Sequence, residues 1–336
     1  MTTADPHVGV IGAGAWGTAL AMLANRAGSR VTLWTRNHQV IDSITERRDN
    51  AQYLPDHFID PAISITHDSA FVSHCDVLIL TIPAQSIRTV AIALSDGVPS
   101  HLPLVIATKG IERGSLMLMS EVLASILPHN PTAILSGPNF AREAAAGLPT
   151  ATVLATHHTS ITEGICFALG GKYFRLYTNA DQVGTQIGGA CKNVLAIAAG
   201  IVEGRGLGEN ARAALITRGL AEIIRLARSK GGSEETLMGL SGIGDIMLSC
   251  TSQRSRNYAL GVALGRAPDA RLLQLLAERR GGLTEGVATA ESVTQLARKL
   301  GVAMPIAFAV SDILSGTVPI SAAIEKLLER PLGSEI

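Results

Sequence analysis

The feature that most constrains the fold is a G-x-G-x-x-G pattern between a short apolar strand and an Ala-rich helix. The predicted strand is His7–Ile11, and the glycines are Gly12, Gly14 and Gly17. A second strand, residues 31–35, completes a strand–loop–helix–strand unit typical of dinucleotide binding. In such a unit Gly12 allows the tight turn, Gly14 lets the backbone approach a pyrophosphate, and Gly17 lets helix and strand pack closely. The helix N-terminus offers its N–H groups and positive dipole to the phosphates.

The residue after the second strand bears on the choice of dinucleotide. An NAD-selective site places Asp or Glu there to bind the ribose 2′-hydroxyl. This chain has Arg36 instead, and a guanidinium suits a 2′-phosphate. An exposed surface arginine is the alternative interpretation. We therefore expect NADPH to be favoured, with NADH also accepted.

Alternation of strands and helices continues through the first half of the chain. Helices are predicted at residues 84–94 and 115–127, and strands at 76–82, 104–108, 132–135, 150–155 and 174–177. A near-continuous apolar strand such as DVLILTI is typical of a parallel strand covered on both faces. Ligands of such sheets lie beyond the carboxyl ends of the strands. Lys109 and the turn at residues 137–139 follow strand ends, so they are candidates to line that crevice. A solvated loop lysine and an ordinary turn are the alternatives.

After residue 180 the strand pattern stops and helical patterns take over. The central stretch is TQIGGACKNVLAIAAGIVEG, residues 185–204, mostly small and apolar with one cation, Lys192. Gly188 and Gly189 lie one turn earlier on the same helical face. Each costs about 1 kcal/mol in a helix relative to alanine, so we infer that they leave room for something to dock beside the ammonium. The alternative is tight helix packing, with Lys192 extending to solvent.

Further helices are predicted over residues 210–229 and 288–300, with another beginning at Met304-Pro305. Asp245 follows a Gly-rich turn, where a carboxylate can serve chemistry or simply cap a helix. The predicted fold class is an α/β Rossmann domain over residues 1–180, followed by an all-helical domain over residues 181–336. The second domain would hold the substrate.

Composition excludes several kinds of partner. Lys+Arg 28 balances Asp+Glu 28, so no charge excess points to nucleic acid. The N-terminus has no signal peptide, and no run of about 18 apolar residues suggests a membrane span. We expect a cytoplasmic protein. No metal site is expected, because the His157-His158 pair is more typical of a loop and the cysteines are scattered without a C-x-x-C motif: Cys75, Cys166, Cys191 and Cys250.

Eight ordered motifs over nearly the whole chain resemble those of the bacterial-type NAD(P)-dependent glycerol-3-phosphate dehydrogenases. They are GAGAWGTALA, LWTR, ATKGIE, SGPNFAREAAAGLPTA, GGACKNVLAIAAGI, ARAALITRGLAE, SGIGDIMLSC and SRN. The resemblance implies a Rossmann domain and a helical domain of the kind shared with 6-phosphogluconate dehydrogenases. It implies reduction of dihydroxyacetone phosphate to sn-glycerol 3-phosphate, the backbone of glycerophospholipids. A homodimer is also the family expectation.

The resemblance assigns roles to individual residues. Lys192 in GGACKN corresponds to the catalytic lysine. The implied substrate-binding residues are Lys109, Gly137, Asn139, Lys192, Asn193, Asp245, Ser255, Arg256 and Asn257. The implied cofactor-binding residues, beside the three glycines of the loop, are Ala15, Trp16, Arg36, Lys109, Ala141, Arg256, Leu283 and Glu285. The chain departs from the family pattern where Ala15 replaces Ser, Asn139 replaces Thr or Ser, and Thr284 replaces Val.

The hypothesis for the chemistry is that Lys192 polarises the ketone and protonates the alkoxide formed by hydride transfer. Asp245 would orient Lys192 or bind a substrate hydroxyl, and Arg256 would bind the phosphate as a planar fork. Two other functions remain open. One is another enzyme of this architecture that reduces a different keto acid, and the other is a cofactor sensor without catalysis. The presence of Lys192, Asp245 and Arg256 together argues against a sensor.

Overall fold

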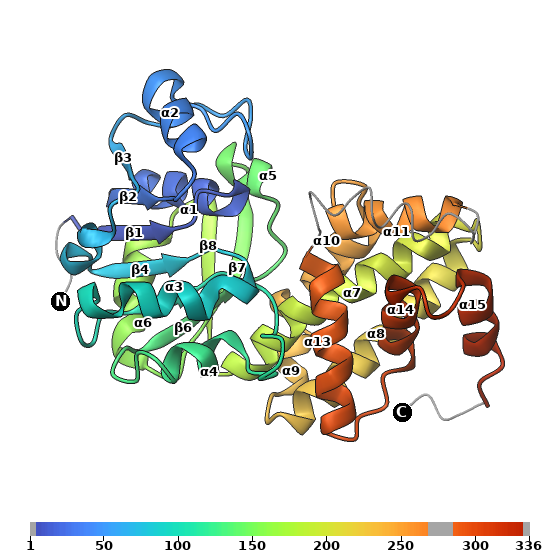
Figure 1. Cartoon of the computed structure of the whole chain (residues 1–336). Coiled ribbons are helices and arrows are strands. Elements are labelled where there is room, and N and C mark those ends of the chain that lie inside the picture. The colour runs from blue at the N-terminus through green and yellow to red at the C-terminus, as the bar shows by residue number, and fades with distance from the viewer. Residues whose placement is uncertain (1–4, 268–284, 332–336) are drawn as a thin grey trace. The chain divides into compact units, whose positions relative to one another are not determined.

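The computed structural model describes residues 5–267 and 285–331 (Figure 1). By its internal packing the chain forms two compact units. The first unit comprises Met1–Glu112 and Met117–Gln186, and the second comprises Arg113–Leu116 and Ile187–Ile336. The boundary falls inside helix α7, Gln182–Gly204.

The first unit is built on an eight-stranded sheet with the order β3-β2-β1-β4-β5-β6-β7-β8. The first six strands pair in parallel, in the order of a Rossmann fold. Strand β7 pairs antiparallel with β6, and β8 pairs parallel with β7. The strands are β1 His7–Ile11, β2 Arg30–Trp34, β3 Ile63–Thr66, β4 Val77–Leu80, β5 Leu104–Ile106, β6 Thr132–Ser136, β7 Thr150–Ala155 and β8 Phe174–Asn179.

Helices on both faces explain why the central strands are continuously apolar. Every residue of β1, β4 and β5 is buried. Because crossover connections are right-handed, the helices that precede β2 and β5 lie on opposite faces of the sheet. The helices of this unit are α1 Ala15–Arg26, α2 His38–Arg47, α3 Ile87–Leu94, α4 Met119–Ala124, α5 Ala141–Ala145 and α6 Thr159–Leu169, with short 3₁₀ helices η1 Ser69–His74, η2 Ala84–Ser86 and η3 Ser95–Gly97.

Among the strands and α-helices of this unit, the sequence did not predict α2, β3, α5 and α6. Helix α2 buries only Val40, Ser43 and Ile44, so its apolar period is weak. Strand β3 and helix α5 are too short to show a period. The helix predicted at residues 115–127 shortens to α4, because Gly114 and Leu116 have positive φ values of 79° and 60° and turn the chain first.

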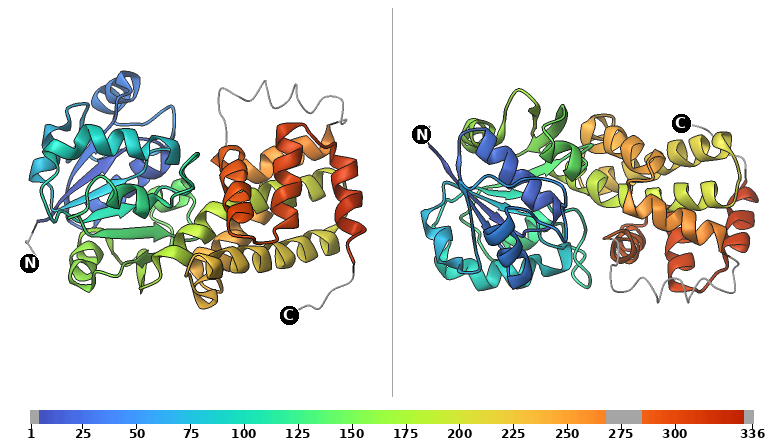
Figure 2. Two further views of the ribbon diagram at one scale, coloured as in Figure 1. Left: turned by 60° about the horizontal axis from the view of Figure 1, so that its bottom comes forward. Right: turned by 90° about the horizontal axis from the view of Figure 1, so that it is seen from above.

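The second unit contains no strand among its described residues (Figures 1 and 2). The predicted fold class, a Rossmann domain followed by a helical domain, is therefore confirmed. Beside the greater part of α7, its elements are α8 Glu209–Ser229, α9 Glu234–Leu237, the π-helix η4 Leu240–Gly244, α10 Asp245–Thr251, α11 Arg256–Arg266, α13 Glu285–Lys299, α14 Pro305–Ser315 and α15 Ile320–Leu328.

Helix α7 is long and apolar enough, by length and composition, to cross a membrane. However, 83% of the relevant window is buried inside the protein. Its small residues therefore pack against other helices of the chain, as in the core helix of a globular domain.

Candidate active site

The glycine loop after β1 is locked by its neighbours. Gly12 has a φ of +113°, which favours glycine. A Cβ on Gly17 would lie 1.8 Å from the Gly12 carbonyl oxygen, so only glycine lets α1 begin this close to the loop. At the end of β4, Thr81 Oγ1 lies 2.9 Å from the Ile11 oxygen and 2.8 Å from the Gly12 oxygen. Thr81, which sequence reasoning missed, thus fixes the loop at the point where the strand order reverses.

Gly14 differs from the other two glycines of the loop. A Cβ at this position would meet nothing within 4 Å, so no packing within the described chain requires glycine there. Gly14 is also the N-cap of α1 and makes no side-chain cap. The N–H groups of Ala15 and Trp16, in the first turn, have no partner within the helix. Open space, a bare backbone and free N–H groups together fit a pyrophosphate.

Arg36 lies just beyond the carboxyl end of β2 and is exposed. The next residue, Asn37, caps α2 by accepting a hydrogen bond from Gln39 N at 3.0 Å. The loop between β2 and α2 contains no carboxylate. Its chemistry therefore fits a 2′-phosphate better than a 2′-hydroxyl.

Beyond β5 and β6 the structure brings three predicted residues close together. Lys109 Nζ donates a hydrogen bond to the Gly137 oxygen at 3.3 Å. Asn139 Nδ2 donates to Thr152 Oγ1 on β7 at 3.0 Å, whereas Asn139 Oδ1 is buried with no partner among the described residues. A Cβ on Gly137 would lie 3.0 Å from Thr152 Cα, so this glycine is needed for close packing. Ala141 is the first residue of α5.

In the second unit, Lys192 is held by two groups of helix α10. Its Nζ lies 2.6 Å from Asp245 Oδ1 and 2.9 Å from Ser249 Oγ. The Asp245 side chain is fully buried and that of Lys192 is 12% exposed. Ser249 was missed by sequence reasoning, although its i, i+4 spacing from Asp245 on a helix was a usable signal. Lys192 therefore does not extend to solvent.

The structure corrects the expectation for Gly188. A Cβ there would lie 2.5 Å from the Ser241 oxygen of η4 and 2.9 Å from Leu237 Cδ2. The bare face of α7 at Gly188 is thus filled by the chain's own π-helix and does not leave room for a ligand. The glycine lets η4 approach α7, and η4 leads directly into Asp245. Asp245 is the first residue of α10, whose N-cap is Gly244.

Next to Lys192, Asn193 belongs to a buried amide network. Asn257 Nδ2 donates to Asn193 Oδ1 at 3.0 Å, and Gly286 N donates to Asn257 Oδ1 at 3.2 Å. These bonds link α7, α11 and the start of α13. Asn193 Nδ2 is buried and has no partner among the described residues, so its two N–H donors remain for a ligand.

The N-terminus of α11 carries the next predicted residues. Ser255 is its N-cap and accepts a hydrogen bond from Tyr258 N at 3.4 Å. Arg256 is exposed in the first turn, beside the free N–H groups of the helix. Glu285, the first residue of α13, is also exposed. Leu283 and Thr284 lie outside the described residues.

The cysteines near Lys192 are not reactive groups. Burial raises the pKa of both Cys191 and Cys250 to about 12, so both are neutral thiols at physiological pH. All four cysteines are free. Within residues 5–267 and 285–331, no group of three or more His, Cys, Asp or Glu side chains is placed to bind a metal ion.

Comparison with known proteins identifies the family. The family model described as NAD-dependent glycerol-3-phosphate dehydrogenase N-terminus matches residues 7–162, and the corresponding C-terminus model matches residues 181–325. A glycerol-3-phosphate dehydrogenase [NAD(P)+] of Rhodospirillum rubrum is 49% identical over 330 residues, which cover 98% of this chain and 94% of that protein. The chain belongs to the NAD-dependent glycerol-3-phosphate dehydrogenase family. It is therefore an oxidoreductase that uses NAD(H) or NADP(H).

Other relatives agree with this assignment. The glycerol-3-phosphate dehydrogenase [NAD(P)+] of Caulobacter vibrioides is 48% identical, over 98% of each chain. The crystal structure of glycerol-3-phosphate dehydrogenase from Coxiella burnetii has a TM-score of 0.91 at 37% identity, over 97% of this dehydrogenase and 99% of that chain. A PanE/ApbA family ketopantoate reductase from Ralstonia eutropha, at 18% identity and a TM-score of 0.58, shares the fold alone.

Proposed function

We propose that this dehydrogenase reversibly reduces dihydroxyacetone phosphate to sn-glycerol 3-phosphate, using NADPH or NADH. The observation that carries the proposal is the Lys192 ammonium, held by Asp245 and Ser249 in a chain whose other unit has a dinucleotide-binding fold. Reduction of a ketone requires a proton donor at the oxygen. The relatives that match 98% of this chain are named glycerol-3-phosphate dehydrogenase [NAD(P)+].

In the proposed mechanism a nicotinamide cofactor, when bound, would supply the hydride that reduces the ketone carbon. Negative charge develops on the ketone oxygen, and Lys192 Nζ stabilises this charge and delivers the proton. Asp245 keeps the ammonium oriented, since its carboxylate lies 2.6 Å from Nζ. Ser249 fixes the same nitrogen from one turn further along α10. In the reverse direction Lys192 accepts the proton from the alcohol.

The substrate phosphate is assigned to the start of α11. Arg256 offers two parallel N–H donors to a phosphate, and the helix N-terminus adds backbone N–H groups. Ser255 and Asn257 flank it, and the unpartnered Nδ2 of Asn193 is a further donor for the substrate. We also propose Lys109, Gly137 and Asn139 as substrate-binding residues, from the motifs in which they stand. Asn139 Oδ1 lacks a partner, so it can accept a hydrogen bond from a substrate hydroxyl.

The cofactor is assigned chiefly to residues 1–180. The glycine loop and the first turn of α1, with Ala15 and Trp16, would bind the pyrophosphate, and Arg36 would favour NADPH through its 2′-phosphate. Ala15 contributes only its N–H group, because it has no hydroxyl. The motifs of the family resemblance also propose further cofactor-binding residues, namely Lys109, Ala141, Arg256, Leu283 and Glu285. Residues 181–336 would bind the substrate. We further propose a cytoplasmic homodimer that supplies the glycerophospholipid backbone.

The test is an absorbance assay at 340 nm with the purified protein. NADPH and NADH consumption would each be followed with dihydroxyacetone phosphate, and unphosphorylated dihydroxyacetone would be the control. We expect phosphate-dependent oxidation, faster with NADPH. Binding of NADPH without oxidation in either case would overturn the substrate assignment and favour a cofactor sensor.

A further inference from the structure

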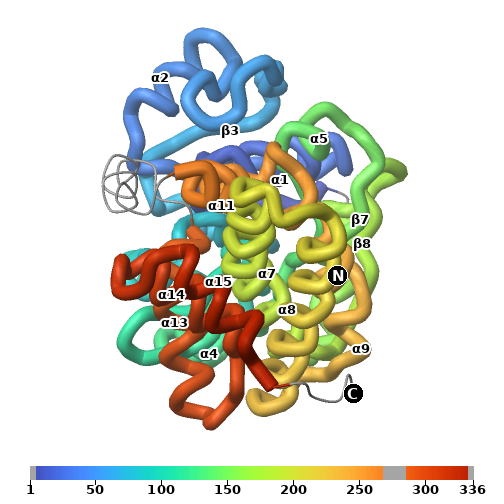
Figure 3. The backbone as a smooth tube through the Cα atoms, turned by 90° about the vertical axis from the view of Figure 1, so that its right-hand side faces the viewer, coloured from blue at the N-terminus to red at the C-terminus, as the bar shows by residue number. Residues whose placement is uncertain are grey.

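Two helices of the second unit carry the same spacing of glycines. Helix α7 has Gly200 and Gly204, and α11 has Gly261 and Gly265. The two helices lie side by side (Figure 3). Gly200 and Gly261 lie inside their helices, where a glycine costs roughly 1 kcal/mol relative to alanine. Two G-x-x-x-G pairs in contact therefore indicate that the close approach of the two backbones is needed.

The two helices cross with their backbones in contact. A Cβ on Gly200 would lie 2.2 Å from the Tyr258 oxygen and 2.9 Å from Gly261 Cα. A Cβ on Gly204 would lie 2.4 Å from the Val262 oxygen and 2.9 Å from Gly265 Cα. The relation is reciprocal, since a Cβ on Gly261 would lie 2.9 Å from Gly200 Cα. These neighbours are backbone atoms and cannot rotate away, so any side chain here must separate the helices.

The crossing shares its helix faces with the amide network of the site. On α11, Asn257 precedes Gly261 and Gly265 at steps of four residues, so all three lie on one face. On α7, Asn193 and Gly200 likewise lie on one face, at a spacing of two turns. The Asn257–Asn193 hydrogen bond of 3.0 Å therefore lies at one end of the glycine crossing. Arg256 directly precedes Asn257.

We propose that Gly204 and Gly265, at the far end of this crossing, are positioning residues for the substrate site. The close contact sets the separation of α7 and α11, and hence where Arg256 and Asn257 stand relative to Asn193. Gly204 is about 16 Å along α7 from Asn193, at 1.5 Å rise per residue, so neither glycine touches the substrate. The inference rests on the proposed function, in which the start of α11 binds the substrate phosphate.

The experiment compares Gly204→Ala with the wild type in the 340 nm assay and in NADPH binding by fluorescence. We expect KM for dihydroxyacetone phosphate to rise on the order of 10- to 100-fold, the loss that a misplacement of about 1 Å can cause. The Kd for NADPH should rise by less than tenfold, equivalent to less than about 1.4 kcal/mol, because Arg256 is only one of its proposed binding groups and the glycine loop and Arg36 lie in the first unit. Alanine suits a helix better than glycine, so a loss cannot come from weaker helix formation.

Two controls separate positioning from general damage. Ala263→Gly lies on α11, on the side away from the crossing, and weakens the helix without pushing α7 away, so its KM should be unchanged. If Gly204→Ala does not fold, Gly265→Ala replaces it, because its closest contact is longer, at 2.6 Å to the Ile201 oxygen. Gly204→Ala and Gly265→Ala with unchanged KM would overturn the inference.

Arg256→Ala, measured in parallel, distinguishes failure of the proposed phosphate site at the start of α11 from failure of the positioning role of Gly204 and Gly265. If it leaves KM for dihydroxyacetone phosphate unchanged, the assignment of the phosphate to α11 fails. If it raises KM while the glycine variants do not, only the positioning role fails.

Discussion

Lys192 Nζ lies 2.6 Å from Asp245 Oδ1, although the two residues are 53 positions apart in the sequence. Both side chains are largely removed from water. Breaking a buried ion pair by removing one partner costs about 3–5 kcal/mol, because the other charge is left uncompensated. Replacing Lys192, the proposed proton donor, should therefore also lower the stability of the second unit.

Replacing Lys192 by alanine should lower kcat by about 10²- to 10⁴-fold, the usual contribution of a general acid. NADPH binding should persist, because the glycine loop is untouched. Steady-state kinetics at 340 nm and fluorescence titration would measure the two effects. Since removal of Lys192 takes away the salt-bridge partner of the buried Asp245 carboxylate, the double variant Lys192→Met/Asp245→Asn provides a control for stability. Near-normal reduction by Lys192→Ala would refute the proposed role.

Ser249 should matter less than Asp245. Ser249→Ala removes one hydrogen bond to a charged group, and we expect a loss of about tenfold in kcat, or about 1.4 kcal/mol of transition-state stabilisation. Asp245→Asn removes the negative charge that orients the ammonium, so its loss should be larger. The order of the two kcat values is the measurement. Equal losses would mean that Asp245 contributes only one more hydrogen bond.

Arg36 should determine the preference between the two cofactors. Arg36→Ala removes a charge-assisted contact worth roughly 1.5–3 kcal/mol, so kcat/KM for NADPH should fall about 10- to 100-fold. The value for NADH should hardly change. Arg47→Ala, which removes the same charge from the exposed end of α2, is the matched control. An unchanged NADPH/NADH ratio in Arg36→Ala would identify Arg36 as an ordinary surface residue.

Arg256 should bind the substrate phosphate through the bidentate geometry of its guanidinium group and not only through its positive charge. Arg256→Lys keeps the charge but loses the bidentate geometry, so KM for dihydroxyacetone phosphate should rise about tenfold, equivalent to about 1.4 kcal/mol. Arg256→Ala should raise it further. Exposed Arg254, two residues earlier, is the control site. A lysine variant with wild-type KM would show that charge alone suffices.

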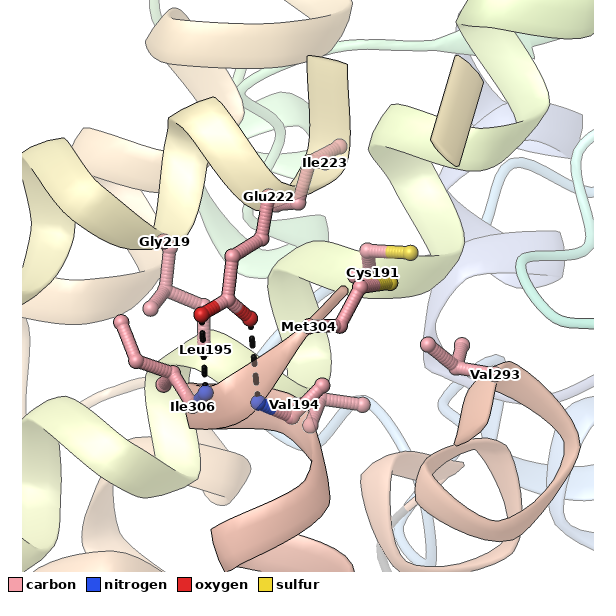
Figure 4. Close-up of a pocket in the computed structure, with 10 residues that line it drawn as sticks. Cys191, Val194, Leu195, Gly219, Glu222, Ile223, Val293, Met304 and Ile306 are labelled. Atoms are coloured by element: carbon pink, nitrogen blue, oxygen red, sulfur yellow. Dashed lines mark hydrogen bonds between the residues drawn. The ribbon is translucent and has the colours of Figure 1, made fainter. Parts of the chain in front are cut away.

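Glu222 should give the protein a pH-dependent stability. Its carboxylate, on α8, accepts hydrogen bonds from Ile306 N at 2.8 Å and Ala307 N at 3.2 Å at the start of α14 (Figure 4). Burial raises its pKa to about 7, against the lowering effect of these two N–H groups. The folded state therefore holds this proton more tightly than the unfolded chain does. Because of this, the free energy of unfolding falls as pH rises from about 4.5 to about 7.

The measurement for Glu222 is chemical denaturation of the wild type and Glu222→Gln between pH 5 and pH 8. The wild type should lose on the order of 2–3 kcal/mol across this range relative to the variant, whose amide does not titrate. Glu329→Gln, at an exposed position near the C-terminus, should follow the wild type. Parallel pH profiles for the wild type and Glu222→Gln would contradict the raised pKa.

Much of the first unit was predictable because its signals are local. The strand–loop–helix–strand order and the positions of Gly12 and Gly17 match the structure, since turn geometry and apolar periods act over a few residues. Strand β3 and helix α2 were missed because their apolar periods are short or weak. The roles of Gly188 and of Ser249 depend on partners far along the chain, Ser241 and Lys192, and no local pattern reports such contacts.

The sequence by itself determined the fold class, the family and the candidate residues. The reason is that apolar periods and ordered motifs are formed by residues close together in the sequence. Only the tertiary structure decided which groups surround Lys192. Because Gly188 has no side chain, η4 can pack against α7, and η4 leads directly into Asp245. The glycine crossing of α7 with α11 places Asn257 within hydrogen-bond distance of Asn193. The reason is steric. How closely two helix backbones approach depends on the atoms of both helices, whereas a local sequence pattern describes only one helix.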